Sequence, residues 1–194
     1  GNTKLKRSNN KKLQKGEKLL VISEQGLGDT LQYMRYIPYL RNQGFDISFC
    51  AQEKLHSLIQ ASDIDPNPLT PEQANTVSNG KWIPLLSLPR SLKVTPNNPI
   101  ISKPYIFSTD ELNKKWEKLL SKEKRPIVGV NWQGNPKMEK IYQGRSIPLE
   151  IFSILLDDNY ISMLSLQKGF GSEQLEHCSF KNQFVECQSA INSC

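Results

Sequence analysis

The stretch that decides the fold is LLVISEQGLGDTLQYMRYIPYLRNQG, residues 19–44. Its apolar run at 19–23 is typical of a strand buried on both faces of a parallel sheet. A glycine turn follows, and the apolar spacing after it predicts a helix over 29–43 that is bent near Pro38 and ends at Gly44. A strand, a glycine turn and a helix N-terminus together direct backbone N–H groups toward an anionic group.

The turn also presents a carboxylate, Asp29, where an anion would be expected to bind. A carboxylate repels phosphate but can take a proton from a hydroxyl, so Asp29 is a candidate general base. The local sequence by itself favours the plainer interpretation, an aspartate that caps the helix after a tight turn. A dinucleotide-binding fingerprint is disfavoured, because Leu31 replaces the third glycine of G-x-G-x-x-G and no acid ends the second strand.

Strand and helix patterns alternate along the rest of the chain, with short connections that are typical of an open α/β sheet. We expect further strands at 46–51, 82–86, 127–131 and 161–166, with 184–187 compatible with one more. We expect helices at 53–61, at 108–121 after a capping box, and at 147–156 after an N-cap at Ser146. Residues 62–80 are expected to hold at most one short strand, and 132–145 a long polar loop. The helix over 108–121 is expected to bury a stripe of Leu112, Trp116, Leu119 and Leu120.

Charge and composition divide the chain into three parts. The net charge is +6, and residues 1–18 account for it with seven Lys or Arg and one Glu. Residues 1–17 are therefore predicted to be a basic disordered tail or linker, and no nucleic-acid-binding face is expected on the remainder. Residues 18–122 predict one α/β domain. Residues 123–194 predict a second α/β domain. This domain is expected to be incomplete, because it has about three predicted strands and a doubly wound domain usually has five or six.

Other classes of protein are disfavoured by the composition. No run approaches the ~18 apolar residues that span a bilayer, and the N-terminus lacks the apolar core of a secretory signal. The four cysteines and two histidines show no ligand spacing, so no metal site is expected. Cys50 ends a strand pattern and is expected to be a buried thiol. This cysteine usage favours a cytoplasmic protein.

Five blocks of sequence occur in the same order in a group of bacterial glycosyltransferases. They are EQGLGDTLQYMRYIPYL (24–40), IPLLSLPRSL (83–92), VGVNWQGNP (128–136), GRSIPLEIF (144–152) and SLQKGFGSEQL (165–175). On these blocks, residues 17–176 resemble the heptosyltransferase-like family, glycosyltransferase family 9. The resemblance is greatest to the members that are fused behind tetratricopeptide repeats.

The resemblance implies the GT-B architecture, in which two Rossmann-like domains face each other across a cleft. The first domain would receive a sugar or protein acceptor, with Asp29 as general base in a loop that includes Gln25, Gly26 and Gly28. The second would hold a nucleotide-sugar, which is the substrate, with no metal or other cofactor. Basic side chains would then offset the charge of the departing diphosphate. The donor-binding residues implied are Gln133, Asn135, Arg145, Gln167 and Lys168.

The chain departs from the family in lacking its later Asp-Thr-x-x-x-His block. The resemblance therefore implies a fragment, an acceptor domain and the beginning of a donor domain, that is inactive alone. An uncovered sheet edge in such a fragment predicts pairing with a second copy. Two alternatives stay open: a non-catalytic α/β module that binds a nucleotide or partner, and a flavodoxin-like regulator in which all strands join one sheet. Trp132 and Tyr142 could stack on a base, but packing in the protein is favoured at least as much.

Overall fold

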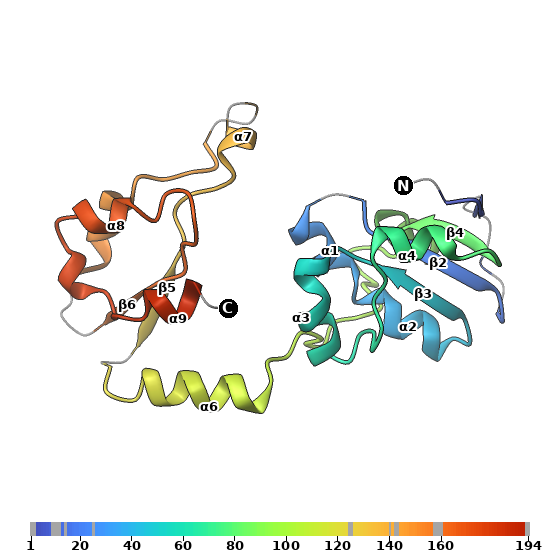
Figure 1. Cartoon of the computed structure of the whole chain (residues 1–194), viewed down its shortest axis with the longest axis horizontal. Coiled ribbons are helices and arrows are strands. Elements are labelled where there is room, and N and C mark those ends of the chain that lie inside the picture. Colours follow the sequence, from blue (N-terminus) through green and yellow to red (C-terminus); the bar gives the residue numbers. More distant parts are fainter. Residues whose placement is uncertain are drawn as a thin grey trace. The chain divides into compact units, whose positions relative to one another are not determined.

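The computed structural model describes residues 3–8, 13, 15–24, 26–123, 126–139, 141, 144–156 and 161–192. The chain divides into two compact units, Gly1–Leu112 and Asn113–Cys194 (Figure 1). This division falls within helix α6 (Asp110–Leu119), whereas the sequence predicts a boundary between residues 122 and 123. Both units contain parallel strands and helices, so the protein is a mixed α/β chain, consistent with a Rossmann-like fold.

The first unit is built on a parallel sheet of four strands in the order β1-β4-β2-β3. In chain order the strands are β1 (Lys6–Arg7), β2 (Lys18–Ile22), β3 (Asp46–Cys50) and β4 (Lys81–Pro84). Helices cover both faces of β2, as the apolar run at 19–23 predicts. Leu19 and Val21 join the buried cluster of α1, α2 and α3, while Leu20 packs with Ala74 of α4.

The basic N-terminal segment contributes the edge strand β1, although its composition predicts a tail or linker. The guanidinium carbon of Arg7 lies 5.4 Å from the ring centroid of Trp82. Ser8 donates its backbone N–H to the Trp82 carbonyl at 2.8 Å. A cation–π contact and a ladder hydrogen bond thus attach a polar segment that has little apolar surface to bury.

The sequence predicts one bent helix after β2, and this prediction is wrong in that the helix is broken. The two pieces are α1 (Leu27–Tyr33) and α2 (Tyr36–Asn42). Pro38 has no N–H to give to the Met34 carbonyl, and the N–H of Ile37 takes that carbonyl instead at 3.0 Å. Pro38 therefore lies in the first turn of α2, where a missing N–H costs little.

The remaining helices of the first unit are short. They are η1 (Glu53–Leu55), α3 (His56–Ala61), α4 (Pro71–Thr76), η2 (Leu85–Ser87) and α5 (Leu88–Ser91). The sequence predicts at most one short strand in residues 62–80, but they contain helix α4. Thr70 and Gln73 form a reciprocal capping box, with Pro71 at the first helical position. The sequence Thr-Pro-Glu-Gln carries this helix-start signal.

Helix α6 begins close to its predicted start but does not bury its apolar stripe. The side chain of Thr109 accepts the N–H of Leu112 at 3.2 Å, as an N-cap residue does. Leu112 is 40% exposed and Leu119 is 42% exposed, while Trp116 and Leu120 are half-buried. The 3.6-residue spacing predicts an apolar face, but it does not predict how fully another element covers that face.

The second unit contains a separate two-stranded parallel sheet of β5 (Ile127–Val130) and β6 (Ser162–Ser165). Because these strands do not join the first sheet, the flavodoxin-like alternative is wrong. Trp132 is buried in the core of this unit with Val130 and Met163, which favours packing over base stacking. Tyr142 lies outside the described residues.

The other elements of the second unit are short helices: α7 (Pro136–Glu139), η3 (Leu149–Leu156), α8 (Gln174–His177), η4 (Lys181–Gln183) and α9 (Gln188–Asn192). The predicted strand at 184–187 is reduced to an isolated bridge between Phe184 and Met163. The predicted α-helix at 147–156 is the 3₁₀ helix η3. Helix α9 follows Cys187, where the sequence carries no clear helix signal. Within the residues that the structure describes, no helix is long and apolar enough to cross a membrane.

Candidate functional site

The glycine turn of the first unit lies at the carboxyl edge of its sheet, directly after β2. Gly26 is the N-cap residue of α1, and Asp29 is the third residue of that helix. Asp29 is exposed, and a Cβ at Gly26 would lie 3.4 Å from its carboxylate oxygen. An acid in the first turn is favoured by the helix dipole. Gly28 is also exposed, and Gln25 lies outside the described residues.

Two hydrogen bonds fasten this turn to the end of the neighbouring strand β3. The hydroxyl of the buried Thr30 donates to the side-chain oxygen of Gln52 at 2.9 Å. The N–H of Ser23 donates to the carbonyl of Cys50, also at 2.9 Å. The backbone that carries Asp29 is thus held at the edge where parallel α/β sheets bind ligands. The sequence gives no signal that pairs Thr30 with Gln52.

A second attachment holds the proline-rich loop that follows α5 against α1. Arg35 donates to the hydroxyl of Tyr105 at 2.9 Å, and its guanidinium carbon lies 4.5 Å from the ring centroid. The Tyr105 hydroxyl in turn donates to the carbonyl of Leu31 at 2.7 Å. The sequence carries no signal for the contact between Arg35 and Tyr105, because it depends on where the loop returns.

Cys50 is buried, as predicted, and burial raises the pKa of its thiol to about 11, with a smaller contribution from Glu72. Since the thiolate is the reactive form, we expect iodoacetamide at pH 8 to modify Cys50 about a hundredfold more slowly in the folded protein than in urea. Peptide-resolved mass spectrometry measures both rates. Equal rates in the two states would show that the thiol is accessible and unperturbed.

In the second unit, the five predicted donor-binding residues lie in two loops that follow β5 and β6. Gln167 is 3% exposed and joins these loops. Its side-chain oxygen accepts the N–H groups of Trp132 at 3.3 Å and Gln133 at 3.0 Å. Its amide nitrogen donates to the carbonyl of Phe170 at 2.8 Å. Because its side-chain amide is bonded inside the protein, Gln167 would support the loops of a donor site rather than contact the donor with that amide.

The same two loops approach each other closely at Gly171. Its carbonyl accepts the indole N–H of Trp132 at 2.9 Å. Gly171 has φ +90°, and a Cβ at this position would lie 2.5 Å from the Cβ of Gln133. Both the backbone conformation and the contact require glycine here.

The loop after β5 is folded around the carboxylate of Glu139. One oxygen accepts the N–H groups of Gly144 at 2.9 Å and Arg145 at 3.1 Å. The other accepts the hydroxyl of Ser146 at 2.9 Å. These hydrogen bonds, that of Ser146 above all, lower the pKa of Glu139. Ser146 therefore serves this loop rather than capping a helix, which corrects its predicted role.

The other predicted donor-binding residues lie around this loop. The side-chain oxygen of Asn135 accepts the N–H of Lys137 at 3.0 Å. The side-chain nitrogen of Gln133 donates to the hydroxyl oxygen of Ser146 at 2.7 Å. Arg145 and Lys168 are exposed. They are the two cations of the predicted set.

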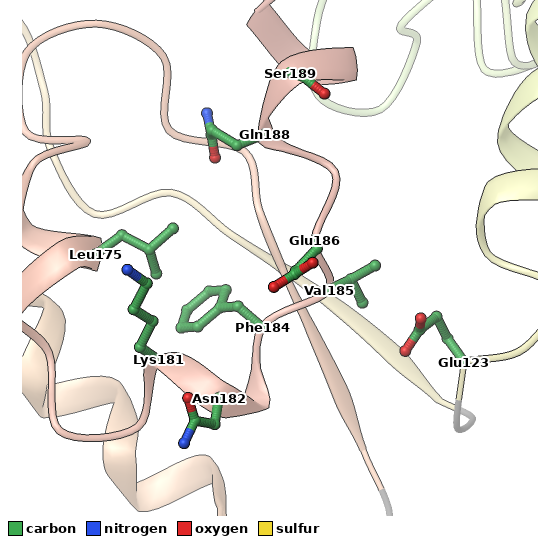
Figure 2. Close-up of a pocket in the computed structure, with 9 residues that line it drawn as sticks. All are labelled: Glu123, Leu175, Lys181, Asn182, Phe184, Val185, Glu186, Gln188 and Ser189. Carbon is green, nitrogen blue, oxygen red and sulfur yellow. The ribbon is translucent and has the colours of Figure 1, made fainter.

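A hollow of about 790 Å³ lies beside Phe184 (Figure 2). Figure 2 shows Lys181 and Glu123 on opposite sides of Phe184 and Val185, with Glu186 between them. Its size suits a small molecule. The charges are of both signs and do not converge, so they indicate no particular ligand.

Among the described residues, no group of three or more His, Cys, Asp or Glu side chains is placed to hold a metal ion. Comparison of the chain with protein-family models, curated proteins and solved structures finds no match. The family resemblance therefore stays a prediction from the sequence blocks.

Proposed function

We propose that this chain supplies the acceptor-side unit and part of the nucleotide-sugar unit of an inverting, metal-independent glycosyltransferase of GT-B type. The observation that carries the proposal is the placement of the two predicted residue sets. Asp29 follows β2 in the first unit, and the loops of Gln133, Arg145 and Lys168 follow β5 and β6 in the second. Both sets therefore lie at the carboxyl ends of parallel strands, where open α/β sheets bind their ligands.

The proposed reaction uses Asp29 as general base. Its carboxylate takes the proton of an acceptor hydroxyl while that oxygen forms a bond to the anomeric carbon of the donor sugar. The bond from the anomeric carbon to the diphosphate breaks, and the nucleoside diphosphate leaves with the electron pair. Arg145 and Lys168 offset the negative charge that grows on the leaving group.

The test of the proposal is calorimetric titration of the chain with the diphosphates of uridine, guanosine, adenosine and cytidine. We expect one of them to bind, and Arg145→Met to weaken that binding about tenfold or more, because a charged hydrogen-bond donor is lost. Asp29→Asn serves as the matched control and should bind equally well, since Asp29 belongs to the acceptor side. If none of the four binds at millimolar concentration, the donor-site assignment fails.

Asp29→Asn is also the variant that tests catalysis. In a full-length version of the protein, we expect it to lower the rate of sugar transfer about a hundredfold or more with the fold intact, because asparagine cannot accept the proton. The measurement is the release of nucleoside diphosphate in the presence of acceptor, with circular dichroism as the check on folding. Unchanged turnover would remove Asp29 from the mechanism. Binding of a diphosphate by the full-length version without any transfer would favour the non-catalytic alternative.

A further inference from the structure

The carboxylate of Glu139 is held by donors that would suit a free anion. We call these donors, the N–H groups of Gly144 and Arg145 and the hydroxyl of Ser146, the 144–146 cradle. All three point at the two oxygens of one carboxylate, at 2.9–3.1 Å. Gly144 has φ +82°. A left-handed residue in such a run turns successive N–H groups toward the same side, which forms an anion-binding nest.

The direction of the Ser146 hydroxyl is fixed by its other partners. Its oxygen accepts the side-chain nitrogen of Gln133 at 2.7 Å and the N–H of Gly134 at 3.1 Å. These two bonds occupy both lone pairs of the hydroxyl, so its hydrogen can only point away from them, into the cradle. The cradle therefore presents donors alone, whatever anion fills it.

One residue of the cradle also carries a positive charge. The exposed Arg145 contributes its backbone N–H to the cradle and carries a guanidinium on the same residue. Hydrogen bonds from fixed donors to an ionised group are stronger than those between neutral groups. A phosphate group brings three acceptor oxygens and more negative charge than a carboxylate, so its hydrogen bonds to the same three donors are stronger.

We propose that the 144–146 cradle is a binding site for a phosphate oxyanion, that Glu139 occupies it in the free protein, and that a bound phosphate displaces the Glu139 side chain into solvent. Glu139 is then an internal competitor that weakens binding of phosphate ligands. The inference deepens the proposed function, on which it rests for the identity of the ligand as the donor diphosphate. The exchange of one anion for another does not depend on that identity.

The test compares wild-type protein with Glu139→Ala by calorimetric titration with inorganic pyrophosphate. An internal competitor on a short loop acts at an effective concentration in the millimolar range, so its removal should tighten binding about tenfold or more. In ¹⁵N–¹H spectra, the amide signals of Gly144 and Arg145 should move on titration. Adding Ser146→Ala to Glu139→Ala removes one donor and should reverse most of the gain.

Glu150→Ala is the matched control in the same unit. Its carboxylate also accepts a backbone N–H and a hydroxyl, both from Ser179, at 2.7 and 2.9 Å. We expect no gain in pyrophosphate affinity from this change. If Glu139→Ala binds pyrophosphate no more tightly than wild type or Glu150→Ala, the proposal is overturned.

A further variant covers the case in which the loop of Glu139→Ala does not fold. Glu139→Gln keeps an oxygen that can accept the N–H groups of Gly144 and Arg145, but it is neutral and competes less well. It should show a smaller gain in the same direction, and its failure to do so would count against the cradle. A gain for pyrophosphate without binding of any nucleoside diphosphate would support the cradle while contradicting the donor site.

Discussion

Replacing Arg41 with alanine is expected to lower the free energy of unfolding of the first unit by about 3 kcal/mol or more. Arg41 of α2 donates to the carboxylate of Asp65 at 2.7 Å and to the carbonyls of Ile64 and Ile47 at 2.7 and 3.1 Å. Asp65 is 3% exposed. The substitution leaves a buried charge without its cation and two carbonyls without this donor, and these losses make the effect large.

Urea unfolding followed by circular dichroism measures the loss, and hydrogen exchange of the β2 and β3 amides assigns it to the first unit. Lys18→Ala is the matched control. Lys18 pairs with Asp46 at 3.8 Å, with both side chains more than half exposed, and such pairs contribute about 0–1 kcal/mol. If Arg41→Ala costs no more than Lys18→Ala, the Arg41–Asp65 pair does not hold the unit together.

The strands are the part of the fold that the sequence predicts best. The strands predicted to begin near residues 19, 46, 82, 127 and 161 correspond to β2 to β6. The signal is strongest for β2, because burial between helices requires continuous apolar side chains. Strand β1 could not be found in this way, since Arg7 is held by Trp82 from a distant part of the chain. The break between α1 and α2 depends on Pro38. It lies about one turn before Pro38, whereas the sequence predicts a bend near Pro38 itself.

The sequence places the residues of the candidate site in segments that follow strands, but it does not predict the contacts among them. The glycine turn marks the segment of Asp29, whereas the donor-binding residues of the second unit come from the family resemblance alone. Glu139 gave no signal, because it reads as an ordinary acid in a polar loop, and its three donors meet only when the loop folds back. The Thr30–Gln52 bond is likewise a contact between neighbouring strand ends that no sequence pattern encodes.

Gly171→Ala is the second substitution with a large expected effect, and Gly169→Ala is its control in the same loop. Both glycines have positive φ, +90° and +72°, so each alanine suffers the left-handed strain of about 1–2 kcal/mol. A Cβ at Gly169 meets nothing within 4 Å. A Cβ at Gly171 would lie 2.5 Å from that of Gln133, and overpacking of this kind adds about 1–3 kcal/mol.

The clash at Gly171 cannot be relieved by rotating the Gln133 side chain, because the atom involved is its Cβ. Backbone must move, yet the N–H of Gln133 is bonded to Gln167, and its side chain is bonded to Ser146. We therefore expect Gly171→Ala to destabilise the second unit more than Gly169→Ala and to shift the indole N–H signal of Trp132. Urea unfolding and ¹⁵N–¹H spectra measure the two effects. Equal losses of stability would mean that the loops after β5 and β6 are not locked together at Gly171.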